Sequence, residues 1–217
     1  MSRVAYHWWW RPGWRPGRRF YTVHATFAGA PAVQALTAKA RDRLAGLPGL
    51  DLIPGQWLHL TMQGIGFADE VNDADLSAII TAAKARLAAV PPVTVVIGPP
   101  AVAGEGVACW ASPPRALDPV RDAVRAGIAD VWGPDRVPEA VARSAHVSVA
   151  YASADGPGEP IEAALGGFAD TAEATIEAVD LIRLGRDHQL YEWETITSLP
   201  LSSMRDTRQA GSRDRRR

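Results

Sequence analysis

Cysteine is almost absent from this sequence of 217 residues. The single cysteine, Cys109, excludes an internal disulfide framework and a zinc site built from several cysteines. No apolar run reaches the roughly 20 residues that a membrane-spanning helix needs, because Pro and Gly interrupt long uncharged stretches such as 90–104. The N-terminus lacks the apolar core and the small-residue cleavage site of a secretory signal. We therefore expect a cytoplasmic protein with no membrane attachment.

The sequence also has little excess charge, but it distributes that charge unevenly. The formal net charge is -1, whereas residues 1–20 hold five Arg and no acid, and residues 205–217 hold six Arg against two Asp. Removing these ends from the totals of 23 basic and 24 acidic residues leaves 12 basic and 22 acidic groups in between. The central body therefore repels polyanions. A nucleic acid partner must be attracted by the basic ends, or must be short.

Hydrophobic periodicity predicts alternating strands and helices through the body of the chain. A composition of 47% hydrophobic and 22% charged residues is that of a folded globular protein. Two-residue alternation predicts strands, and helical spacing bounded by Pro, Gly or a capping Asp73 or Asp75 predicts helices. The expected strands are 20–27, 57–63, 93–97, 106–111, 144–151, 175–184 and 189–197, and the expected helices are 32–47, 73–90, 117–132 and 161–168. This order indicates an α+β fold with antiparallel or mixed sheets.

The two ends differ from the body. The segment 1–19 carries four of the eight Trp, which is too much apolar area to leave in water, so we expect it to pack irregularly on the body. The alternative is a stacking and charge platform for a nucleic acid base, because Arg and Trp interleave there. Residues 205–217 are expected to form a basic, disordered tail.

Three of the five histidines stand in the triplet His-x-Thr/Ser, at His24, His59 and His146. The second triplet, with Thr61, and the third, with Ser148, are flanked by aliphatic residues in strict alternation. Each of these two strands then presents an imidazole and a hydroxyl on one face and aliphatic side chains on the other.

This pair of strands suits one kind of chemistry. Two imidazoles that face each other can act as general base and general acid near neutral pH. The hydroxyls beside them can donate hydrogen bonds to the non-bridging oxygens of a phosphate held between. Together they supply what metal-free cleavage of a phosphodiester requires.

The motifs Leu58-His-Leu-Thr-Met-Gln63 and His146-Val-Ser-Val-Ala-Tyr151 resemble the paired signatures of the two-histidine phosphoesterase superfamily, in its 2'-5' RNA ligase-like, 2',3'-cyclic phosphodiesterase branch. The resemblance covers about residues 20–200 and departs from the usual pattern in having Ser148 where Thr is common. It implies one domain, 20–204, with two pseudo-symmetric lobes, about 20–92 and 93–200, helices on their outer faces and an active-site cleft between.

The resemblance also implies an activity. The expected reaction opens a 2',3'-cyclic phosphate to a 2'-phosphate, and the reverse direction joins ends through a 2'-5' linkage. By analogy His59 gives the leaving-group proton, His146 takes a proton from water, and Thr61 and Ser148 bind the phosphate. The expected partner is an RNA 3' end or a small cyclic nucleotide, and we expect a monomer without cofactor or metal.

Other residues are candidates for substrate binding. By strand parity Trp57 and Gln63 share the His59 face, so Trp57 can stack a base, or else close the edge of the core, and Gln63 can bond the sugar or phosphate. Tyr151 falls on the opposite parity from His146 unless a bulge intervenes.

Two further residues complete the set. Arg143 can reach a phosphate from the rim of the cleft, although a rim arginine is often only solvated. His24 stands in a third triplet, and the family pattern contains only two. We therefore expect His24 to be a residue of the cleft wall or a structural residue. Neither closely spaced metal ligands nor a complete phosphate-binding glycine loop occurs in the sequence.

Two other classes of function stay open. A nucleic acid or nucleotide-binding module can keep the fold without turnover. A structural protein can satisfy both histidines inside its core.

Overall fold

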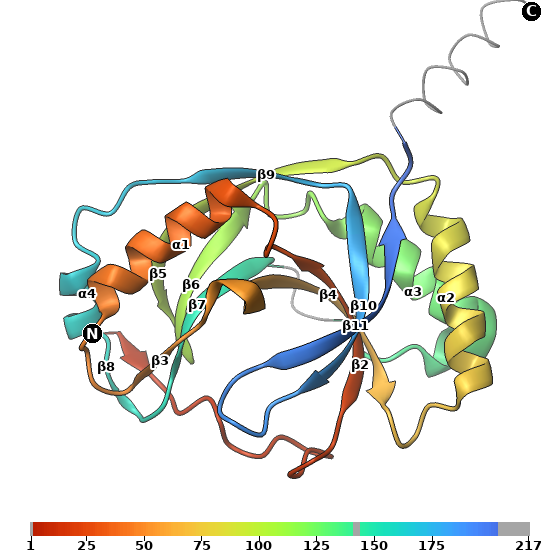
Figure 1. Ribbon diagram of the computed structural model, residues 1–217, viewed down its shortest axis with the longest axis horizontal. Helices are drawn as coiled ribbons and strands as arrows, with labels where there is room; N and C mark the ends of the chain where they lie inside the picture. Colours follow the sequence, from red (N-terminus) through yellow and green to blue (C-terminus); the bar gives the residue numbers. More distant parts are fainter. Residues whose placement is uncertain (1, 141–143, 204–217) are drawn as a thin grey trace, which may run out of the picture.

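Two antiparallel sheets that face each other form most of the protein, as the computed structural model of residues 2–140 and 144–203 shows (Figure 1). The four-stranded sheet has the order β11-β10-β2-β4 and the five-stranded sheet the order β3-β7-β6-β5-β9. Their bounds are β2 Phe20–Thr26, β3 Leu50–Leu52, β4 His59–Phe67, β5 Val93–Ala103, β6 Gly106–Ser112, β7 His146–Ala152, β9 Ala172–Ile176, β10 Ala178–Gly185 and β11 Glu192–Pro200. The expected α+β class is confirmed.

The helices lie on the outer faces of the sheets (Figure 1). Helices α1, Pro31–Leu44, and α4, Glu159–Ala164, pack against strands of the five-stranded sheet. Helices α2, Asp73–Leu87, and α3, Asp118–Trp132, pack on each other and on the four-stranded sheet. Short 3-10 helices, Gly55–Trp57 and Pro134–Arg136, lead into β4 and away from α3. None of the helices in the described part of the chain is long and apolar enough to span a membrane.

The start of α2 differs from the expectation. Neither Asp73 nor Asp75 caps this helix, because the side chain of Asn72 accepts the hydrogen bond of the Asp75 amide at 2.8 Å. The two aspartates instead occupy the first turn, where a negative charge is stabilised by the exposed amides of the helix end.

The two lobes are not contiguous in sequence, so the expected division at residue 92 is wrong. Helix α1 and strand β3 precede residue 92 but belong with the five-stranded sheet, whereas α3, β10 and β11 follow it and belong with the four-stranded sheet. The expected single strand 175–184 is divided between the two sheets, with β9 ending at Ile176 and β10 beginning at Ala178 (Figure 1). Local periodicity cannot show such a crossing, because both halves alternate in the same way.

Strands β4 and β7 each contain a bulge at the same place in the motif. Opposite β2, the register of β4 skips Met62, the residue after Thr61. Opposite β6, the register of β7 skips Val149, the residue after Ser148. An unpaired residue in one strand reverses the faces of the residues that follow it.

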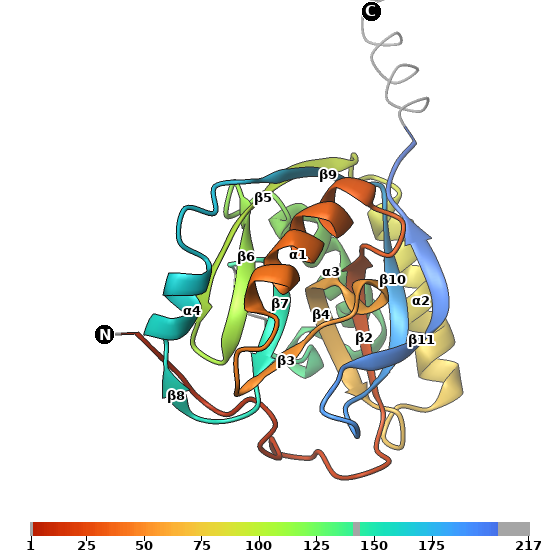
Figure 2. The ribbon, with the colours of Figure 1, turned by 60° about the vertical axis from the view of Figure 1, so that its left-hand side comes forward.

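The N-terminal segment ties the two sheets together, and we call residues 5–19 the strap. It runs along the lower edge of the molecule from β1, Arg3–Val4, which pairs with β8, Gly156–Pro157, to β2 (Figures 1 and 2). Within it Trp8 is 5% exposed, whereas Trp9 and Trp10 are 44% and 49% exposed. Trp8 is therefore packed on the body. The basic tail expected at 205–217 lies outside the described residues.

Candidate active site

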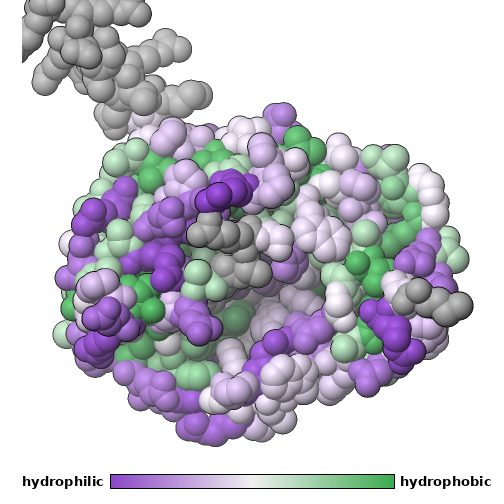
Figure 3. Space-filling view, turned by 180° about the vertical axis from the view of Figure 1, so that it is seen from behind, coloured by the Kyte–Doolittle hydropathy of each residue, from purple (hydrophilic) through white to green (hydrophobic). Residues whose placement is uncertain are grey.

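The two motifs meet at one cavity of about 500 Å³ between the sheets. His59 and Thr61 point into it from β4, and His146 and Ser148 from β7. Their neighbours along each strand are fully buried aliphatic side chains, so alternation places the polar side chains on the cavity face as expected. Seen from behind, the surface of the molecule is hollowed near its middle (Figure 3).

Both histidines are held in the same way. His59 Nδ1 lies 2.9 Å from the carbonyl oxygen of Trp57, and His146 Nδ1 lies 3.2 Å from that of Ser144. A carbonyl oxygen only accepts, so each Nδ1 carries a hydrogen and donates it. In the neutral ring this leaves Nε2 of both residues as the atom that can take or return a proton.

The two rings differ in their surroundings. His59 is half-buried, whereas His146 is exposed. Burial, with a smaller contribution from the positive form of His146, lowers the pKa of His59 from its usual value to about 4, and the hydrogen bond to Trp57 opposes this shift. His59 is therefore neutral near pH 7.

His24 supports His59 from the neighbouring strand. Its ring stacks on that of His59, with centroids 4.3 Å apart and planes at 5°. Its side chain is 2% exposed, and burial followed by the charge of His59 keeps its pKa well below the usual value. His24 lines the cavity, as expected of a wall residue, and stays neutral.

Tyr151 reaches the cavity because of the bulge at Val149. The skipped residue places the Tyr151 side chain on the same side as Ser148, and both line the cavity. Burial raises the pKa of Tyr151, so its hydroxyl keeps its proton.

The equivalent bulge in β4 turns Gln63 away from the cavity, so its expected place on the His59 face is wrong. Its buried side chain donates to the carbonyl oxygens of Gly64, Pro138 and Glu139 and accepts from Arg125 Nη1 at 2.9 Å. Gln63 therefore holds the segment of Pro138 and Glu139, and these two residues line the cavity in its place.

Trp57 is also absent from the residues that line the cavity. It ends a 3-10 helix rather than continuing β4, so strand parity does not apply to it. Its ring packs edge-on against Trp193 at 4.8 Å, and Trp193 packs edge-on against His59 at 5.3 Å. Trp57 is partly buried against the core and does not line the cavity, and its carbonyl oxygen also orients His59. Arg143 lies outside the described residues.

Most of the other residues that line the cavity were not predicted from the sequence. The strap contributes His7, Arg11 and Trp14, and the loop after β10 contributes Tyr191. The one signal for them was the interleaving of Arg and Trp in residues 7–19, which indicated a base platform as an alternative to plain packing.

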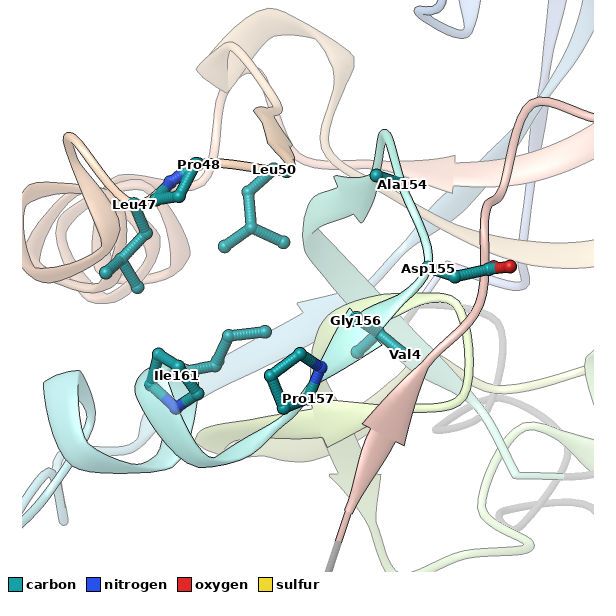
Figure 4. Close-up of a pocket in the computed structure, with 11 residues that line it drawn as sticks. Val4, Leu47, Pro48, Leu50, Ala154, Asp155, Gly156, Pro157 and Ile161 are labelled. Atoms are coloured by element: carbon teal, nitrogen blue, oxygen red, sulfur yellow. The ribbon is translucent and has the colours of Figure 1, made fainter.

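A second hollow, of about 320 Å³, carries no comparable set of groups. Side chains of Leu47, Leu50, Pro157 and Ile161 point into it, and of the described residues that line it only Asp155 titrates (Figure 4). The Asp155 carboxylate accepts from the amide of Tyr6. Among the residues that the structure describes, no three His, Cys, Asp or Glu side chains lie close enough to hold a metal ion.

The fold and this pair of motifs define a class of protein, the two-histidine phosphoesterases. TT0787 of Thermus thermophilus superposes with a TM-score of 0.63 at 17% identity, over 86% of this chain and 99% of its own. LigT of E. coli gives 0.62 at 12% identity over the same shares, and a structure described as a phosphoesterase gives 0.59 at 14% over 87% and 100%. No curated protein sequence matches the chain.

The family follows from the sequence match. The 2'-5' RNA ligase superfamily model matches residues 27–188. The chain belongs to this superfamily. The strap lies before the matched region.

Proposed function

We propose that this protein opens 2',3'-cyclic phosphates to 2'-phosphates without a metal ion, and that the same residues can join ends through a 2'-5' linkage in the reverse direction. The observation that carries the proposal is the placing of two equally anchored imidazoles and two hydroxyls around one cavity. A volume of about 500 Å³ is within the range of small-ligand sites and suits a single nucleotide unit.

In the proposed reaction, His146 Nε2 takes a proton from a water molecule whose oxygen attacks phosphorus. His59 Nε2 gives a proton to the O3' atom as the P–O3' bond breaks, so the product keeps its phosphate on O2'. Thr61 and Ser148 donate hydrogen bonds to the non-bridging oxygens, where negative charge increases in the transition state.

The low pKa of His59 is compatible with its role as the acid. A phosphate anion between the rings stabilises the charged form of an imidazole, so substrate binding raises the pKa of His59. The proton is then present when the leaving oxygen needs it. In the free protein, the buried ring stays neutral.

Relatives support a nucleotide-sized ligand. Structures of LigT of E. coli contain 3'-AMP, ATP, NADP+ or phosphate. We propose that this chain likewise takes a nucleotide or an RNA 3' end, with the acidic body favouring short substrates.

The test is the hydrolysis of 2',3'-cyclic AMP in the presence of EDTA, with separation of 2'-AMP from 3'-AMP. We expect 2'-AMP as the product and no change of rate on addition of divalent ions. Rate loss in EDTA that a divalent ion restores would contradict the two-histidine mechanism. Binding of the nucleotide without turnover would instead identify a binding module on the same fold.

A further inference from the structure

We infer that the strap provides a binding site for a second phosphate of the substrate, with Arg11 as its cation. This inference rests on the proposed function. It narrows the substrate class to nucleotides that carry another phosphate besides the cyclic one, and it assigns a role to a segment outside the region that matches the family.

Arg11 belongs to the same cavity as the two histidines, so both can reach one nucleotide. Its side chain is 34% exposed and is oriented by its neighbours. One terminal nitrogen donates to Glu105, and the guanidinium lies 5.0 Å from the centre of the Trp9 ring. A guanidinium has five N–H donors in a planar fork, so these contacts leave donors for a phosphate.

The strap is fixed on both sheets, so Arg11 does not depend on a flexible end. The amide of His7 donates to the carbonyl oxygen of Ala152 at 2.9 Å, on the five-stranded sheet. The amide of Gly17 donates to Asp187 at 2.9 Å, and Arg18 pairs with Asp69 at 2.8 Å, on the four-stranded side. A guanidinium held in advance loses less conformational freedom on binding an anion.

Arg186 holds the middle of the strap. It is 3% exposed, donates to the carbonyl oxygen of His7 at 3.2 Å, and lies within 6 Å of the ring centres of Trp8, Trp10, Trp14 and Tyr191. The faces of these rings attract its guanidinium and hold it beneath the strap.

The charges at this end of the cavity favour an anion. The fields of Arg11 and Arg186 reach Tyr191, and that of Glu105 opposes them, so two cations face one carboxylate. Burial lowers the pKa of His7 to about 4 against the effect of Glu105, so His7 adds no charge near pH 7. Glu139 lines the cavity from the segment that Gln63 holds, and a phosphate avoids that wall.

The test compares the binding of 2'-AMP with that of adenosine 2',5'-bisphosphate, two product analogues that differ by one phosphate. We expect the full-length wild-type protein to bind the bisphosphate about 10-fold to 100-fold more tightly, as a charge-assisted hydrogen bond to phosphate allows. Arg11→Gln should remove this preference. Arg15→Gln is the matched control, because Arg15 is a strap arginine that pairs with Asp69 and does not line the cavity.

Equal wild-type affinity for the two ligands, or a preference that survives in Arg11→Gln, would overturn the inference. If Arg11→Gln does not fold, the affinities of the wild-type protein for the two ligands still test whether a second phosphate is bound. Turnover of 2',3'-cyclic AMP is measured separately, so failure of the inference can be distinguished from failure of the proposed function. If the protein hydrolyses the cyclic nucleotide but binds both ligands equally, only the phosphate site of the strap is contradicted.

The second phosphate has two possible sources, and turnover separates them. One substrate is 5'-phosphoadenosine 2',3'-cyclic phosphate, and the other is the dinucleotide ApA that ends in a 2',3'-cyclic phosphate. A larger loss of kcat/KM in Arg11→Gln for the mononucleotide indicates a free nucleotide, and a larger loss for the dinucleotide indicates an RNA end. Equal loss for both and for 2',3'-cyclic AMP contradicts the site.

Discussion

Strands β4 and β7 present the same local apparatus in two different environments. Each anchors its histidine through Nδ1 to the carbonyl oxygen two residues earlier, and each has a bulge directly after the hydroxyl residue. His59, however, is half-buried and stacked on His24, whereas His146 is exposed. The comparison teaches that two strands of equal geometry can place their imidazoles in different surroundings, and that burial lowers the pKa of His59.

The largest expected effect comes from removing either imidazole. His59→Ala and His146→Ala should each lower kcat for 2',3'-cyclic AMP by about 10²–10⁴-fold or more, since each removes one proton transfer. His188→Ala is the control, because His188 is exposed and pairs with Glu192 in the hairpin. Steady-state rates measure the loss of activity, and circular dichroism checks that the variants fold. Full activity in His59→Ala or in His146→Ala would contradict the equivalence of the two strands.

Removing the hydroxyls should cost less. Thr61→Ala and Ser148→Ala should each lower kcat about 10-fold to 10³-fold, because each removes one donor to a phosphate oxygen. Thr94→Ala is the matched control, since Thr94 is an exposed strand residue that contacts only Thr175 through its hydroxyl in the described hydrogen bonds. If the two strands are equivalent, the two losses are similar; a loss confined to one strand would show that phosphate is bound by that strand alone.

The difference in burial predicts the pH dependence. We expect the active form to carry one proton on the pair of imidazoles. This form is lost when His59 takes up a further proton, which happens only near pH 4. The acidic limb of kcat/KM should therefore lie near pH 4, well below the usual value of 6.5. In His146→Gln, NMR titration should show a higher pKa for His59, still below 6.5, because the opposing charge is removed and the burial remains. Titration of the wild-type His59 near 6.5 would show that burial does not set its charge.

The smallest effect is expected at His24. His24→Ala removes the ring that stacks on His59 but no reacting group, so kcat should fall by much less than in the two motif variants. His24→Phe keeps an aromatic ring in the stack and should fall less than His24→Ala. Activity assays of both variants check this order. A loss in His24→Ala as large as that in His146→Ala would contradict the assignment of the reaction to the motifs of His59 and His146.

Much of the fold could be predicted because its elements are locally encoded. Alternation identified β2, β4, β6 and β7, and Pro and Gly punctuation identified α1 and α3 within a few residues. The sharing of elements between the sheets could not be predicted, because it depends on contacts between distant segments. Strand β3 was missed since its three residues are too few for a periodic signal.

The meeting of the two motifs at one cavity could be predicted for the same reason, and the other residues that line the cavity could not. His59 and Thr61 are two residues apart on a regular strand, so parity holds between them. Beyond Met62 the bulge reverses parity, which excludes Gln63 from the cavity, and the bulge at Val149 brings Tyr151 in. Arg11 comes from an irregular segment whose position depends on long-range contacts alone.

The most direct test of the paired-strand account is the single-turnover rate of the double variant His59→Ala/His146→Ala on 2',3'-cyclic AMP, measured beside both single variants. Residues that act as a unit on one phosphate give strongly non-additive losses. The account predicts that the double variant is little slower than the slower single variant. A double variant whose loss is the product of the two single losses would contradict it, because the two imidazoles would then act independently.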